Sequence, residues 1–86
     1  MTWTDSAAKH GVSREDVLWA TGHAVGSEAA PGRPGWTTRV WVGRPHAQAD
    51  RYLEVIAAAR GSEFVIFHAM PVTDIYRRLI IEKGSS

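Results

Sequence analysis

The stretch Arg51–Pro71, RYLEVIAAARGSEFVIFHAMP, contains two strand patterns separated by Arg-Gly-Ser. The first pattern, Arg51–Ala59, alternates between two sides, with Glu54 on the less apolar one. The second pattern, Glu63–Ala69, is apolar almost throughout, which is typical of a strand covered on both faces. Gly61 suits the left-handed position of a tight turn, so the stretch predicts an antiparallel hairpin that the final proline ends.

His68 lies near the end of the second predicted strand. If Arg60–Ser62 form the hairpin loop, Glu54 stands opposite His68, with their Cβ atoms about 5 Å apart. A carboxylate there would hold the imidazole and favour its protonated form. A loop one residue shorter would turn the two side chains to opposite faces. The alternative is a half-buried ring bonded to backbone at the edge of the sheet.

Helices are predicted on both sides of this hairpin. Thr4–His10 favours a short helix, and Ser13 is placed to cap a second one over Arg14–Ala24, with acidic residues in its first turn. Thr73 caps a last helix that stops at Gly84. Five apolar residues share one side of this helix and are expected to lie on the sheet: Val72, Ile75, Tyr76, Leu79 and Ile80.

A third strand pattern, TTRVWVG over Thr37–Gly43, alternates with Arg39 and Trp41 on one face. The preceding Gly26–Trp36 contains three glycines and two prolines, which predicts a loop without regular structure, either mobile or functional. The fold class is therefore α+β, with two N-terminal helices, a three-stranded antiparallel meander and a C-terminal helix. We expect a single domain over residues 1–83, with residues 84–86 as a frayed tail.

Composition narrows the function. The chain of 86 residues carries ten Lys and Arg against nine Asp and Glu, and it has no cysteine. Disulfides, thiolate metal sites and cysteine nucleophiles are excluded, which fits a cytoplasmic location. No apolar run approaches the roughly 20 residues of a membrane span. Proteins that bind phosphate backbones through bulk charge are far more basic, so a basic site would have to be local.

The four histidines show no metal-ligand spacing, and no glycine motif for nucleotide phosphates occurs, so neither a metal nor another cofactor is expected. The remaining His, Arg, Lys, Glu and Tyr side chains suit metal-free RNA cleavage. This reaction needs a base for the 2′-hydroxyl, an acid for the leaving oxygen and cations for the charge on phosphorus. His68 is the candidate acid or base, and Glu54 is the candidate that orients it.

Several other residues have a functional and a structural interpretation. Arg39 and Trp41 can bind phosphate and stack a base, or the arginine stem can cover the indole on a solvated face. Arg77 can bind phosphate, or it can simply lie on the solvent side of the last helix. Lys9 and His10 can act in the site, or they can be polar residues at a helix end.

The segment KHGVSREDV, Lys9–Val17, resembles the KHGVSFEEA-type segment of BrnT-like toxins, which are small ribonucleases with a RelE-like fold. The order of the other segments is also similar: WTD before the first helix, WVGR after the loop, a long hairpin and an arginine-rich last helix. Lys9 falls on the lysine of that family, and Arg44 falls on an arginine that follows its first long strand. One departure concerns His68-Ala69-Met70, which stands where the family commonly has a Ser-Ala-Arg-like triplet.

This resemblance implies a toxin of a type II toxin–antitoxin pair that cleaves RNA to stop translation. Its partner would be a cognate antitoxin of ribbon-helix-helix type that also binds DNA. In this hypothesis His68, Glu54 and Lys9 are catalytic, and the RNA-binding set is Arg39, Arg44, Arg77 and Trp41. The alternative is a catalytically inactive RelE-like module that binds protein or nucleic acid, where an uncovered face of the meander would suit a homodimer or a partner helix.

Overall fold

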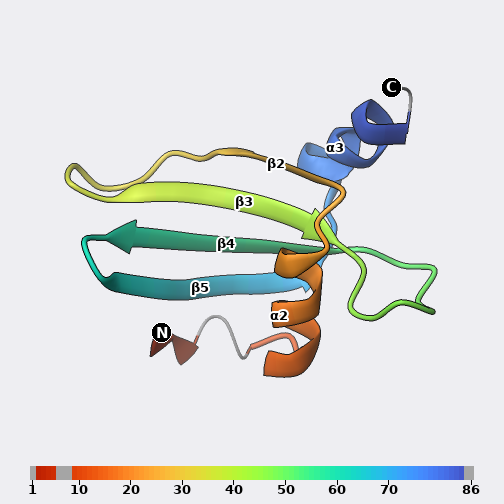
Figure 1. The fold of residues 1–86 in the computed structure, drawn as a ribbon, viewed down its shortest axis with the longest axis horizontal. Helices are drawn as coiled ribbons and strands as arrows, with labels where there is room; N and C mark the ends of the chain where they lie inside the picture. Colours follow the sequence, from red (N-terminus) through yellow and green to blue (C-terminus); the bar gives the residue numbers. More distant parts are fainter. Residues whose placement is uncertain (1, 6–8, 85–86) are drawn as a thin grey trace.

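The computed structural model describes residues 2–5 and 9–84, which form one five-stranded mixed sheet and two helices (Figure 1). The strands are ordered β1-β5-β4-β3-β2 across the sheet. In chain order the elements are β1 Thr2–Trp3, α2 Arg14–Gly22, β2 Gly26–Ala29, β3 Thr37–Gly43, β4 Leu53–Arg60, β5 Glu63–Pro71 and α3 Asp74–Gly84. The α+β class is confirmed, but the predicted three-stranded meander with three helices is wrong.

Two edge strands account for the difference in the sheet. Gly26–Ala29, predicted as loop, pairs antiparallel with β3, and Thr2–Trp3 pairs parallel with β5. Edge strands need backbone partners on one side only, so short sequences without a strand pattern can form them. The predicted helix Thr4–His10 falls partly on residues 6–8, which lie outside the described residues.

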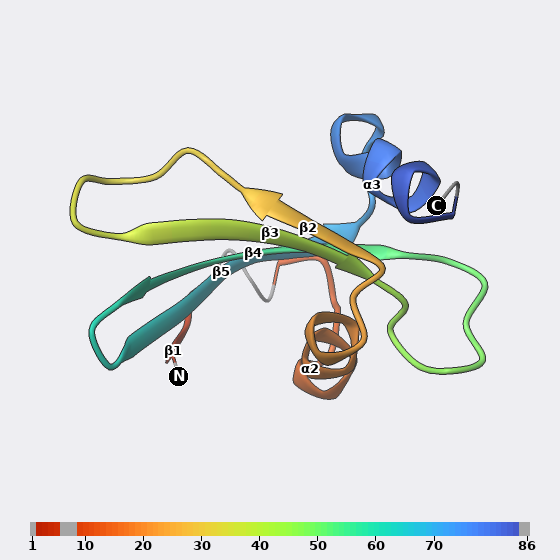
Figure 2. The same cartoon turned by 45° about the horizontal axis from the view of Figure 1, so that its top comes forward.

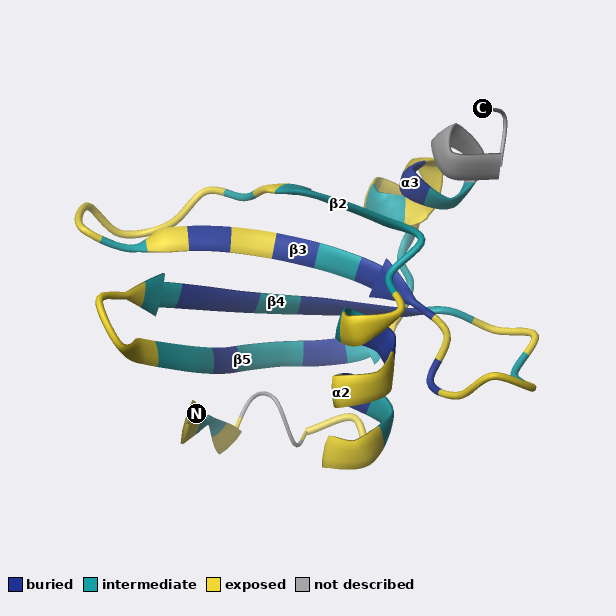
Figure 3. Cartoon of the chain, viewed as in Figure 1, coloured by how far each residue is buried: buried dark blue, intermediate teal, exposed yellow. Residues whose placement is uncertain are grey.

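The two helices cover opposite faces of the sheet (Figure 2). The face that α2 covers is called the α2 face and carries Val55 and Ile66. The face that α3 covers is called the α3 face and carries Val40 and Val42. The alternation predicted for β3 is confirmed, since Val40 and Val42 are buried while Arg39 on the other face is exposed. The buried residues concentrate on the central strands β3 and β4 (Figure 3).

Helix α2 begins as the sequence predicts. The Ser13 side chain accepts a hydrogen bond from the Asp16 backbone N–H at 3.2 Å, which satisfies one of the free donors of the first turn. Val17 and Ala20 are buried against the sheet. The helix ends at Gly22, two residues before the predicted end.

Helix α3 lies on the other face, with Leu79 buried and Val72, Tyr76 and Ile80 packed around it. Ile75 was expected to join them but is 70% exposed, so that part of the prediction is wrong. Arg78 hydrogen-bonds Glu28 of β2 and thereby lowers the pKa of that carboxyl. Neither helix in the described part of the chain is long and apolar enough to cross a membrane.

The hairpin of β4 and β5 contains one irregularity. Arg60 pairs with Glu63, so the turn has two residues rather than the expected three, and Gly61 takes a φ of 58° in the pattern of a type II′ turn. The register then shifts between Ile56 and Ala57, where β5 holds one extra residue, Phe67. This β-bulge changes which face every later residue of β5 occupies.

Close contact between α2 and β3 generates a stability prediction. A Cβ atom on Gly43 would lie 2.2 Å from the Ala20 carbonyl oxygen, so Gly43→Ala must displace the helix. We expect the free energy of unfolding to fall by about 2 kcal/mol, measured by urea denaturation. The control is Gly22→Ala, where a Cβ atom has nothing within 4 Å and the helix gains up to about 1 kcal/mol. An unchanged midpoint for Gly43→Ala would contradict this packing.

Candidate functional site

A buried carboxylate on β4 forms the centre of the candidate site. The side chain of Glu54 is 4% exposed, and its Oε2 accepts a hydrogen bond from His68 Nε2 at 2.8 Å. Its Oε1 accepts from the backbone N–H of Thr73 at 2.7 Å and from the Thr73 hydroxyl at 2.5 Å. Both oxygens are therefore satisfied, as a carboxylate away from water requires.

The bulge at Phe67 makes the contact between His68 and Glu54. The predicted pairing of Glu54 with His68 is wrong, because Glu54 stands opposite Met70 and His68 opposite Ile56. The two-residue turn alone would have put His68 on the α2 face, and the extra residue returns it to the α3 face. His68 and Glu54 are therefore diagonal neighbours on one face, within reach of each other.

The hydrogen bond to Glu54 leaves one ring nitrogen of His68 for chemistry. A carboxylate can only accept, so Nε2 carries the proton and Nδ1 of the neutral ring has a lone pair. Within the described part of the chain Nδ1 makes no hydrogen bond, and the side chain is 27% exposed. Such a ring can exchange a proton at Nδ1 while the hydrogen bond to Glu54 holds its orientation.

A second imidazole, which is not among the predicted site residues, lies beside the first. The ring centroids of His10 and His68 are 6.4 Å apart, in an edge-to-face arrangement with an interplanar angle of 68°. Lys9, the predicted catalytic lysine, directly precedes His10 in an exposed turn. The signal that could have found His10 is its place in the KHGVS segment, next to Lys9.

Two predicted RNA-binding residues lie on the opposite face from His68. Trp41 packs with the α2-face core and has its ring centroid 6.2 Å from that of Phe64. Arg39 is exposed on the same face and donates from Nε to the Ser27 hydroxyl at 3.1 Å. The structure therefore keeps these two residues together but does not bring them to His68.

The other two predicted arginines have local partners. The Arg44 guanidinium carbon lies 5.5 Å from the centroid of the Tyr52 ring, in the loop that follows β3. Arg77 pairs with Asp74 at 3.3 Å on the exposed side of α3. No interaction links either arginine with His68 among the residues the structure describes.

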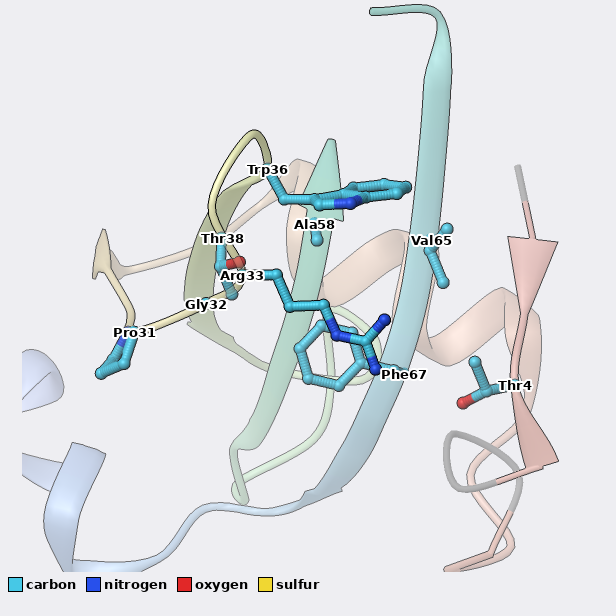
Figure 4. Close-up of a pocket in the computed structure, with 9 residues that line it drawn as sticks. All are labelled: Thr4, Pro31, Gly32, Arg33, Trp36, Thr38, Ala58, Val65 and Phe67. Carbon is cyan, nitrogen blue, oxygen red and sulfur yellow. The ribbon is translucent and has the colours of Figure 1, made fainter. Parts of the chain in front are cut away.

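A pocket of about 580 Å³ lies on the α3 face, toward the hairpin end of the sheet (Figure 4). Phe67, the residue before His68, forms part of its wall. The other lining residues come from β1 and its end, from the loop before β3, and from the central strands: Thr4, Pro31, Gly32, Arg33, Trp36, Thr38, Ala58 and Val65. This size is typical of sites for small molecules, which occupy about 300–1,000 Å³.

The loop wall of the pocket is a defined turn. Trp36 N–H donates to the Arg33 carbonyl at 3.1 Å, Pro34 follows Arg33, and Gly35 has a φ of 87°, which is the pattern of a type II turn. Gly32 lies so close to Thr38 that a Cβ atom would be 2.0 Å from the Thr38 hydroxyl oxygen. The tetrapeptide RPGW is a turn signature, and it is the sequence signal that could have indicated this wall.

Neither metal ligation nor family membership identifies the site. No group of three or more His, Asp or Glu side chains in residues 2–5 and 9–84 is arranged to hold a metal ion. Comparison of the chain with protein-family models, with curated proteins and with solved structures finds no match in any of the three. The functional argument therefore depends on the geometry of the side chains.

The three bonds of Glu54 predict a large cost for its removal. Glu54→Ala leaves the Thr73 N–H and the His68 ring without their acceptor, so we expect a loss of about 3 kcal/mol in unfolding free energy. The control is Glu63→Ala, which removes an exposed pair with Arg60 and costs less than about 1 kcal/mol. Chemical denaturation compares the two, and equal losses would contradict an anchoring role for Glu54.

Proposed function

We propose that this protein is a metal-independent endoribonuclease and the toxin of a type II toxin–antitoxin pair. The observation that carries the catalytic part is the bond from His68 Nε2 to the buried carboxylate of Glu54 in a partly exposed position. This arrangement fixes one tautomer and presents the other ring nitrogen, as an acid–base histidine requires. The toxin assignment depends on the resemblance of Lys9–Val17 to BrnT-like toxins.

The proposed reaction is a transfer within the RNA chain. His68 Nδ1 takes the proton of a 2′-hydroxyl, whose oxygen forms a bond to the adjacent phosphorus. The bond from phosphorus to the 5′-oxygen breaks, and the protonated ring of His10 gives that oxygen its proton. The products are a 2′,3′-cyclic phosphate and a free 5′-hydroxyl, and Lys9 supplies positive charge for the phosphate oxygens.

The proposed partner is a cognate antitoxin, a DNA-binding protein of ribbon-helix-helix type. Leu18 and Trp19 are adjacent on α2 and remain 46% and 38% exposed. Apolar side chains that stay exposed in this way are suited to a protein contact. A neighbouring gene for such a protein would support the toxin assignment independently of the chemistry.

Replacement of the proposed base tests the activity. With purified protein and labelled single-stranded RNA in the presence of a chelator, His68→Ala should lower the cleavage rate by a factor of about 10²–10⁴. The control His46→Gln changes a histidine in an exposed loop and should leave the rate unchanged. Cleavage by His68→Ala at the wild-type rate would rule out the assignment of His68.

A catalytically inactive module that binds protein or nucleic acid is the second candidate. It is favoured by the two hydrogen bonds that Thr73 donates to Glu54 Oε1, which give the carboxylate a structural role at the start of α3. In this case the wild-type protein would retard labelled RNA in a gel, or bind its partner, without producing any fragments. Fragments that end in a cyclic phosphate would exclude this candidate.

A further inference from the structure

We propose that the pocket beside Phe67 is a subsite for one base and an adjacent phosphate of single-stranded RNA. The proposal rests on RNA as the substrate of the proposed function, and it adds where the strand binds. Four observations support it: the charge of Arg33, which has no carboxylate partner among the described residues, the indole wall of Trp36, the mostly apolar lining, and the position of the pocket next to His68.

Arg33 gives the pocket its preference for an anion. Its side chain extends into the pocket from the turn before β3 (Figure 4). In the described part of the chain no carboxylate forms an ion pair with Arg33, and none of the described lining residues is acidic. A guanidinium without a carboxylate partner offers a planar pair of donors to a phosphate group.

Trp36 gives the pocket a surface for a flat ring. The Arg60 guanidinium carbon lies 4.4 Å from the centroid of the indole, and Glu63 holds Arg60 in turn at 2.8 Å. Arg60 does not line the pocket, so it covers the indole from outside and leaves the ring available as a wall within. A supported aromatic wall is suited to stacking of a nucleobase.

The backbone places this subsite next to the acid–base pair. Phe67 and His68 are consecutive residues, and the bulge brings His68 to the α3 face, which Phe67 also faces. A strand with one base in the pocket can therefore continue along β5 with its next phosphate at His68. Arg33 and Trp36 occupy positions i and i+3 of one hydrogen-bonded turn, so base and phosphate would be bound by a single unit of the chain.

Binding of a non-cleavable RNA tests the subsite separately from catalysis. The probe is a fluorescein-labelled 2′-O-methyl hexanucleotide of mixed sequence, and anisotropy gives its dissociation constant between 50 and 300 mM salt. We expect Trp36→Leu to weaken binding roughly tenfold or more without changing the salt dependence. Arg33→Gln should weaken binding and reduce the salt slope by about 0.7, the loss of one phosphate contact on a single strand.

Arg51→Gln is the matched control, since it removes an exposed arginine that does not line the pocket, and it should keep the salt slope of the wild type. Unfolding midpoints check that each variant is folded, and Arg33, which is exposed, provides the test if Trp36→Leu is unstable. Wild-type affinity and slope in a folded Arg33→Gln would overturn the subsite, whatever the RNA cleavage assay gives. Weakened binding in both variants of a protein that never cleaves RNA would support the subsite and reject the nuclease.

Discussion

The hydrogen bonds that the buried carboxylate of Glu54 accepts hold together the part of the fold that contains the candidate site. A carboxylate that is 4% exposed must find donors inside the protein, and its donors come from β5 and from the residue before α3. One side chain of β4 thus fixes both the ring of His68 and the start of a helix. Its negative charge also lies at the positive end of the α3 dipole, which adds to the attraction. The same carboxylate therefore determines both the position of the His68 ring and the docking of α3.

The sequence predicted the elements that depend on local patterns. The alternation of β3, the Ser13 cap of α2 and the extent of α3 all follow from periodicity and capping, which neighbouring residues determine. The contact of Glu54 with His68 does not follow in the same way. The predicted three-residue loop with regular pairing brings the two side chains to one face, and so does the observed two-residue turn with a bulge. The predicted loop was one residue too long and the bulge was not predicted, and these two errors cancelled. A pattern of alternating residues does not reveal where one extra residue is inserted.

The elements that sequence reasoning missed are those stabilised by distant parts of the chain. Gly26–Ala29 has no strand pattern, but the backbone of Gly26 lies against Leu79 of α3, where a Cβ atom would approach within 2.9 Å. This strand therefore packs against a helix residue more than 50 positions away in the sequence. The loop that follows was predicted to be mobile or functional, but its composition could not reveal that Arg60 of the hairpin lies over the Trp36 ring. Such contacts become visible only in the assembled sheet.

The bulge at Phe67 determines both the register of β5 and the face on which His68 lies. With regular pairing beyond Ala57, Phe67 would still face α3, but His68 would point into the α2-face core. The extra residue places an aromatic wall and an imidazole side by side on one open face. A bulge interrupts the ladder and leaves backbone groups without their regular partners, so it persists where other contacts compensate. The hydrogen bond from His68 to Glu54 is such a contact, and the same bond makes the histidine suitable for acid–base chemistry.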